Sequence, residues 1–221
     1  MSKSVYSLVL TDQVVEAIDA LAYAMGTSRS ALIDRILAGH VSYTTPEMRI
    51  NGIFDSVSRL MAQHSGFIVQ TSQAGDRMMS IRSSLKYKYK PTLRYSLQLL
   101  RSSEKTEGEL KVSFRTQSAE LKARMGDFLR LWAALEDKYI VNSLPDGIRY
   151  LIEDGRFTRS FTLPDSYRDK SDEEIAGAIA AYIHMFDDVL KVYFANLDNG
   201  TADEAAVQRY SEYLKNGITI I

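Results

Sequence analysis

Residues 5–39 read VYSLVLTDQVVEAIDALAYAMGTSRSALIDRILAG. The stretch opens with β-branched, aromatic and aliphatic residues at 5–10, a composition that favours a strand. Thr11 then marks a helix start, and apolar residues recur after it at helical spacing. Gly26 can adopt the left-handed conformation that ends a helix, and Ser28 opens a second apolar helix. The predicted order is therefore strand, helix, tight turn, helix.

A segment of this length cannot bury a sizeable core by itself. Its single strand also has no partner within the segment, so the backbone groups of that strand would stay unpaired. Both difficulties disappear if two chains pair their strands antiparallel and pack their helices together. The sequence therefore predicts that residues 1–43 form a dimerisation module.

This arrangement resembles the ribbon-helix-helix family of bacterial repressors, the MetJ/Arc type. The resemblance covers residues 4–43 only. The residues that support it are Leu10-Thr11-Asp12, the spacing of Val14, Ile18 and Leu21, and above all the turn Gly26-Thr27-Ser28-Arg29-Ser30 before an apolar helix. The resemblance implies a dimer whose paired strands lie as a ribbon in the DNA major groove. It also implies phosphate contacts at the start of the second helix, where backbone N–H groups and the helix dipole attract anions.

The resemblance also implies roles for single residues. Tyr6, Leu8 and Leu10 would face the dimer core, because alternate residues of a strand point to opposite sides. Two features depart from the family: the outward Val5 and Val9 cannot form hydrogen bonds, and residues 1–43 have a net charge of −1 where phosphate needs cations. The residues implied in DNA contact are Lys3, Val5, Ser7, Val9, Ser28, Arg29 and Ser30.

Residues 44–221 are expected to form a larger α+β domain of β-hairpins and long helices. Asp154-Gly155 is typical of a hairpin turn, and two stretches, Ser171–Glu174 and Thr201–Glu204, have the spacing of capping boxes that open helices. Asp187-Asp188 lies within the first of these helices and is interpreted as a polar patch. The other expected elements are helices at 47–64 and 118–139 and strands at 85–90, 93–99, 110–114, 148–152 and 157–163.

Basic side chains are concentrated in the middle of the chain. Residues 77–103 contain seven Arg and Lys and no acid, whereas residues 140–221 have a net charge of −6. Within the basic stretch, alternation would place Lys86, Lys88 and Lys90 on one face of a strand and the intervening tyrosines on the other. These lysines are candidates for a secondary nucleic-acid contact through phosphate attraction. The alternative is a solvated lysine face over a tyrosine core. The basic and acidic parts would then complement each other inside the fold or across a dimer.

Composition excludes several classes of protein. A chain of 221 residues with 45% hydrophobic and 25% charged residues is neither disordered nor low in complexity, and the absence of cysteine excludes disulfides and thiolate metal sites. His40, His64 and His184 are widely spaced and lack carboxylates at metal-ligand spacing, so no metal or cofactor is expected. No catalytic motif is found, and we expect no enzyme. The absence of a signal peptide or a long apolar run predicts a cytoplasmic protein away from membranes.

The function expected from these features is a DNA-binding transcriptional regulator of the repressor type. It would act on double-stranded DNA as a homodimer or higher homo-oligomer, while residues 44–221 sense a ligand or assemble further. One alternative is a protein–protein adaptor or inhibitor, antitoxin-like, in which the first module only dimerises and a protein is the partner. Another is an enzyme with a site in the second domain. The outward valines favour the adaptor, and the Ser28-Arg29-Ser30 helix start favours DNA.

Overall fold

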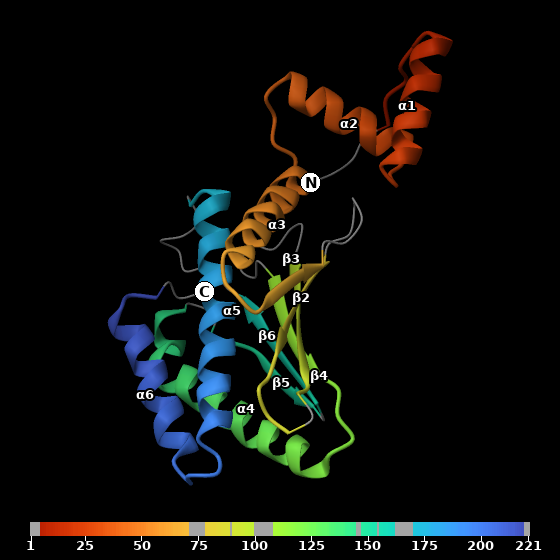
Figure 1. The fold of residues 1–221 in the computed structure, drawn as a ribbon. Coiled ribbons are helices and arrows are strands. Elements are labelled where there is room, and N and C mark those ends of the chain that lie inside the picture. The colour runs from red at the N-terminus through yellow and green to blue at the C-terminus, as the bar shows by residue number, and fades with distance from the viewer. Residues whose placement is uncertain are drawn as a thin grey trace.

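The computed structural model describes residues 5–70, 78–88, 90–99, 108–144, 147–153, 155–161 and 170–218. Within these residues the architecture is α+β, with six α-helices and a six-stranded antiparallel sheet (Figure 1). The helices are α1 (Asp12–Ala24), α2 (Arg29–His40), α3 (Pro46–Ala62), α4 (Ala119–Tyr139), α5 (Asp172–Ala195) and α6 (Ala202–Lys215). The strands are β1 (Phe67–Gln70), β2 (Met78–Ser84), β3 (Thr92–Leu99), β4 (Gly108–Phe114), β5 (Tyr150–Glu153) and β6 (Arg156–Phe161).

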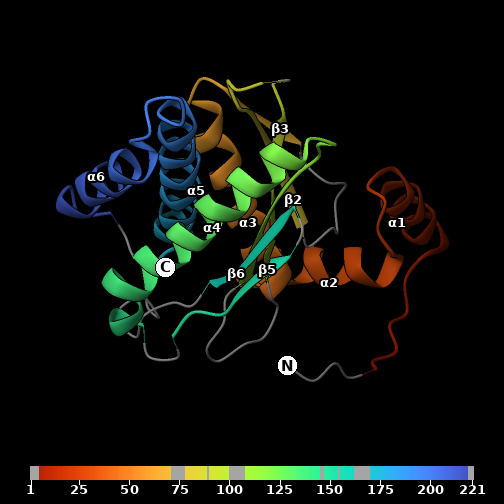
Figure 2. The same ribbon diagram turned by 90° about the horizontal axis from the view of Figure 1, so that it is seen from below.

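In the part of the chain that the structure describes, helices α3, α4, α5 and α6 pack on one face of the sheet. Its strand order is β1-β2-β3-β4-β6-β5, so the first four strands form a meander and the β5–β6 hairpin joins through β6. Strand alternation sends Tyr95, Leu97 and Val112 into a core shared with α3, α4, α5 and α6. α1 and α2 stand apart from this layered body (Figures 1 and 2). The opposite face of the sheet carries polar and basic side chains.

The centre of the core is aromatic. Trp132 of α4 is fully buried, and its ring centroid lies 4.7 Å from that of Phe186 and 5.2 Å from that of Tyr210. Its indole Nε1–H donates a hydrogen bond to the Tyr182 hydroxyl over 3.0 Å. The edge-on ring geometry matches the preferred arrangement of aromatic pairs. These contacts fix α4, α5 and α6 against one another beneath the sheet.

An ion pair lies fully buried inside this core. The Arg159 Nε of β6 lies 3.1 Å from an oxygen of Glu136 on α4, and both side chains are sealed from solvent. The guanidinium also sits 4.4 Å from the ring centroid of Tyr182. Burial raises the pKa of Glu136, and the charge of Arg159 acts in the opposite direction. The pair connects the sheet to its covering helix by charge as well as by packing.

The strand predicted at 85–90 is wrong. β2 ends at Ser84, and the chain then reverses into β3 through a turn in which the Leu85 N–H bonds to the Pro91 carbonyl over 3.0 Å. The Lys90 N–H bonds to the Tyr87 carbonyl over 2.8 Å, and Lys90 has a positive φ of 42°. The turn thus satisfies its own backbone groups, which a sheet ladder would otherwise use. The Tyr87 ring packs on the ring of Phe194. Tyr87 is therefore apolar in its surroundings although it lies in a turn, and the apolar–basic alternation at 85–90 does not indicate a strand.

Most of the other elements predicted for residues 44–221 are present. The helices predicted at 47–64 and 118–139 are confirmed as α3 and α4, and the strands at 93–99 and 110–114 as β3 and β4. The hairpin of β5 and β6 is also present, with Gly155 at a φ of 74°, while Asp154 and residues 162–169 lie outside the described residues.

The two predicted capping boxes differ. At Ser171 both reciprocal bonds are present, since its hydroxyl accepts from the Glu174 N–H and the Glu174 carboxylate accepts from the Ser171 N–H. At Thr201 the box is wrong, because that side chain makes no capping bond and its ψ of 22° turns the residue away from the extended conformation of a cap. The two motifs have the same spacing. The capping bonds form only where the first residue has the extended backbone conformation, as Ser171 does.

Replacing Ser171 with alanine is expected to lower the free energy of unfolding by about 1 kcal/mol, because an N–H group at the start of α5 loses its acceptor. Thr201→Ala is the matched control and should change stability little, since no bond is lost. Urea unfolding of both variants measures the difference. If both variants lose the same free energy of unfolding, the capping bonds of Ser171 do not stabilise the protein.

The strand predicted at 5–10 is not formed in the single chain. Residues 5–10 have no regular secondary structure and pair with no described segment, and regular structure begins at α1. A strand requires a neighbour to receive its backbone hydrogen bonds, and one chain offers none here.

Candidate nucleic-acid interface

The extended N-terminal segment is open to solvent on both sides. Val5 and Val9, expected to face outward, are fully exposed, and Ser7 between them is exposed as well. Leu8, expected to face a dimer core, is also 58% exposed. Lys3 lies outside the described residues. Among the described residues of one chain, therefore, both sides of this segment are largely exposed.

The exposed apolar surface continues over α1 and α2. Leu21 on α1 is 47% exposed and Leu37 on α2 is 51% exposed, and Val14 and Ile36 are similarly open. Such continuous apolar exposure is uncommon on a monomer and marks a surface that another molecule covers. The hydrophobic residues buried in this part of the chain are Ala22, Leu32 and Ala38.

The turn between α1 and α2 has the geometry that its sequence predicts. Gly26 has a φ of 61°, and the Ser28 hydroxyl caps α2 by accepting from the Ala31 N–H over 3.2 Å. Arg29 forms an ion pair with Asp19 of α1, and its hydrogen bond lowers the pKa of that carboxyl group. Arg29 remains half-exposed and therefore accessible to a phosphate, although its charge is already shared with Asp19.

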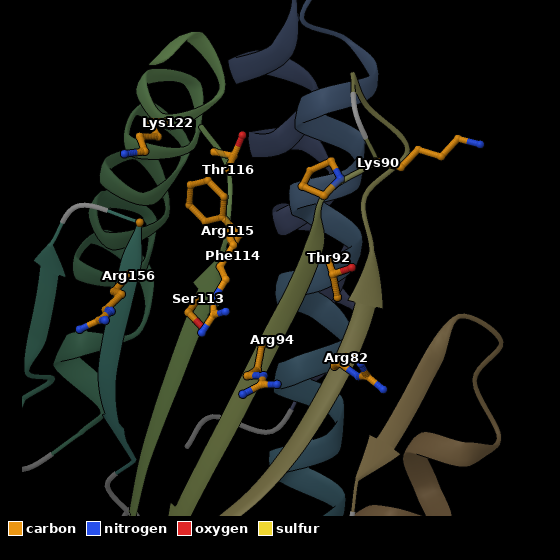
Figure 3. Close-up of a pocket in the computed structure, with 12 residues that line it drawn as sticks. Arg82, Lys90, Thr92, Arg94, Ser113, Phe114, Arg115, Thr116, Lys122 and Arg156 are labelled. Atoms are coloured by element: carbon orange, nitrogen blue, oxygen red, sulfur yellow. The ribbon is translucent and has the colours of Figure 1, made fainter. Parts of the chain in front are cut away.

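The three candidate lysines do not share one face. Lys86 is exposed in the β2–β3 turn, and Lys88 reaches the carboxylate of Glu120 on α4 over 3.3 Å. Lys90 lies at the rim of a hollow of about 750 Å³ on the open face of the sheet (Figure 3). The structure thus separates these residues because they lie in a turn.

Sequence reasoning missed the hollow. Strand register aligns Arg82 of β2 with Arg94 of β3, Arg94 with Ser113 of β4, and Ser113 with Arg156 of β6. Figure 3 shows these four side chains on neighbouring strands. The only signal in the sequence was the excess of basic residues at 77–103, which includes two of these arginines.

Asp187 is buried and belongs to a hydrogen-bond network. Its interpretation as part of a polar surface patch is therefore wrong. Its carboxylate accepts from the Tyr95 hydroxyl over 2.8 Å and pairs with Lys191 over 2.5 Å. Lys191 also donates to Ser83 of β2 over 2.8 Å. The network joins α5 to the sheet, and burial and the Asp187 charge raise the pKa of Tyr95.

Two histidines that are distant in the sequence meet in the fold. The rings of His64 and His184 have centroids 4.3 Å apart, and the Tyr213 hydroxyl lies 3.1 Å from His184 Nδ1. Burial lowers the pKa of His184, and the neighbouring His64 lowers it further, against the opposing effect of Asp188. His184 therefore favours its neutral form in the folded chain.

Stability is expected to fall as the pH drops below about 6.5, because the unfolded chain then takes up a proton that folded His184 binds less readily. The loss ends once the pH lies below the lowered pKa of the folded state. Melting temperatures on both sides of this window measure it, and His184→Gln should reduce the slope. His40→Gln, at the exposed end of α2, should leave the slope unchanged, and a slope that both variants keep would contradict the assignment to His184.

Comparison with protein-family models, with curated proteins and with solved structures finds no match to this chain. Among the described residues, no helix combines the length and the apolar character required to cross a membrane. In the same part of the chain, no three His, Cys, Asp or Glu side chains gather as a metal site would require.

Proposed function

We propose that this protein is a DNA-binding transcriptional regulator, of the repressor type, that binds double-stranded DNA as a homodimer. The observation that best supports the proposal is the uncovered apolar surface of residues 5–43, which joins an unpaired extended segment to two helices. A second copy of the same segment supplies what each chain lacks, namely a strand partner and a cover for its leucines. The ribbon-helix-helix resemblance then gives the complex its function.

In this dimer, antiparallel pairing of residues 5–10 covers Leu8 and directs Ser7 into the major groove between two valines. Each valine can contact a thymine methyl group, and Ser7 supplies a hydrogen bond to a base edge. The N-terminus of α2 then meets the DNA backbone, where its N–H groups and the half-exposed Arg29 bind phosphate.

A protein–protein adaptor is the second candidate. The Arg29–Asp19 ion pair and the apolar pair Val5 and Val9 favour it, because both features reduce the affinity of the module for DNA without weakening a dimer. In that case the module only brings two copies together, and the partner is a protein.

A salt titration of the full-length protein tests the proposal, with duplex DNA from upstream of its own gene compared with random duplex. We expect tighter binding to the upstream site, with a salt slope that counts the phosphates contacted. Arg29→Ala should weaken binding to both duplexes and reduce the slope by about 1, and Ser7→Ala should change sequence preference. Arg124→Ala removes the same charge from an exposed site on α4 and serves as the control.

Two results would contradict the regulator. Absence of binding at low salt would favour the adaptor. Equal, weak binding to both duplexes that Arg29→Ala leaves unchanged would place DNA attraction on the basic residues of the sheet instead.

A further inference from the structure

The hollow on the open face of the sheet has a basic lining. Its lining contains six basic side chains and no Asp or Glu among the described residues. The six are Arg82, Lys90, Arg94, Arg115, Lys122 and Arg156. Three of them lie on β2, β3 and β6, two lie in the segments before β3 and after β4, and Lys122 lies in the first part of α4.

Strand register holds three of these arginines in one row. Arg82 and Arg94 are direct cross-strand partners, and Ser113 separates Arg94 from Arg156. Neighbouring strands lie about 4.8 Å apart, so the row places guanidinium groups at intervals of about 5–10 Å on one face. Like charges directly opposite each other destabilise a sheet, so this row has an electrostatic cost in the unliganded chain.

The arginines of the row have no carboxylate of the described residues within ion-pair distance, and the acid beside the row is Glu153 of β5, the cross-strand partner of Arg156. Arg82, Arg94, Arg115 and Arg156 form no ion pair with any carboxylate that the structure describes. The Nε atom of Arg82 is shielded from solvent and has no hydrogen-bond partner in the described structure. A buried donor of this kind is expected to have an acceptor, and an anion in the hollow would supply one.

We propose that this hollow binds a small anion that contains two or more linked phosphate groups. Arginine presents a planar set of donors that matches phosphate oxygens, and a row of three can hold consecutive phosphates. Ser113, Thr92 and Thr116 add hydroxyl donors along the lining. The volume of about 750 Å³ lies in the range of small-molecule sites. Nucleoside triphosphates and inorganic triphosphate share this chemistry.

A single-stranded nucleic acid fits the hollow less well. Such ligands stack their bases on exposed aromatic side chains. Phe114 is the one aromatic residue in the described lining, and it is buried on the core side of β4. The site is independent of the DNA-binding proposal, because none of its residues belongs to residues 5–43.

Calorimetric titration of the full-length protein at physiological salt tests the assignment, with sodium triphosphate, ATP and monophosphate as probes. We expect one triphosphate site per chain, and binding at least about tenfold tighter than that of monophosphate. Arg94→Gln and Arg156→Gln should each weaken triphosphate binding by about tenfold or more, for the same reason. Binding of ATP would identify a nucleotide as the source of the phosphates, and its exclusion would identify inorganic polyphosphate.

Arg124→Gln removes the same charge outside the hollow and should keep the parental affinity. Because Arg94 and Arg156 are exposed, both variants should fold, which melting temperatures verify. The proposal is overturned if Arg94→Gln binds triphosphate like the parent, or if Arg124→Gln loses as much. It is also overturned if oligo-dT binds more tightly than triphosphate and Arg94→Gln abolishes that binding, since the face then belongs to nucleic acid.

Discussion

Replacing Arg159 with methionine is expected to lower the free energy of unfolding by about 3–5 kcal/mol. The substitution leaves the Glu136 carboxyl group sealed in the aromatic core without its counter-ion. A buried carboxylate without a partner must either remain charged at high cost or take up a proton. Guanidinium unfolding of the full chain, followed by circular dichroism, measures the loss.

Two further variants test the cause of that loss. The double variant Arg159→Met/Glu136→Leu removes both charges and should recover most of the stability, because apolar groups of similar size replace a desolvated pair. Arg130→Met breaks the exposed pair with Asp127 and should change stability by about 1 kcal/mol at most. A double variant as unstable as Arg159→Met would show that packing, rather than the unpaired charge, is responsible.

In the proposed dimer, introducing glutamate at Leu21 and Leu37 together is expected to separate the two chains into monomers. Burying a leucine side chain contributes about 1.5–3 kcal/mol, and each substitution counts twice in a symmetric dimer. Each should therefore raise the dimer dissociation constant about a hundredfold or more. Sedimentation equilibrium over a range of concentrations gives the dissociation constant directly.

Gln13→Glu adds charge to an exposed polar position of α1 and should leave the dimer intact. Deletion of residues 1–43 should have the same effect as the double glutamate variant. A dimer that survives both changes would place self-association in residues 44–221, and a parent chain that is monomeric at all concentrations would overturn the dimerisation module.

Sequence patterns predicted elements that have one clearly apolar face. β3 was predictable because its alternate residues Leu93, Tyr95, Leu97 and Leu99 are all buried in the core. α4 was predictable because its buried apolar residues recur at helical spacing. β2 escaped notice because Ser83, a polar residue, lies among its core-facing positions, where it accepts from Lys191.

The residues of the hollow could not be predicted as a group. Arg82, Arg94 and Arg156 lie on three strands, and their proximity depends on the register of every strand between them. Hydrophobic alternation tells which face a residue occupies but not which residue lies beside it. The same limit applies to the contact of His64 with His184.

The packing of α3 on α5 has a consequence for the order of events during synthesis. The apolar face of α3, with Ile53, Phe54 and Val57, is completed only by a helix that ends at Ala195. At about 5–20 residues per second, the ribosome exposes that face for on the order of ten seconds before its partner emerges. During this interval the native partner that α3 already has is β1, and the rest of its apolar face stays open to non-native associations.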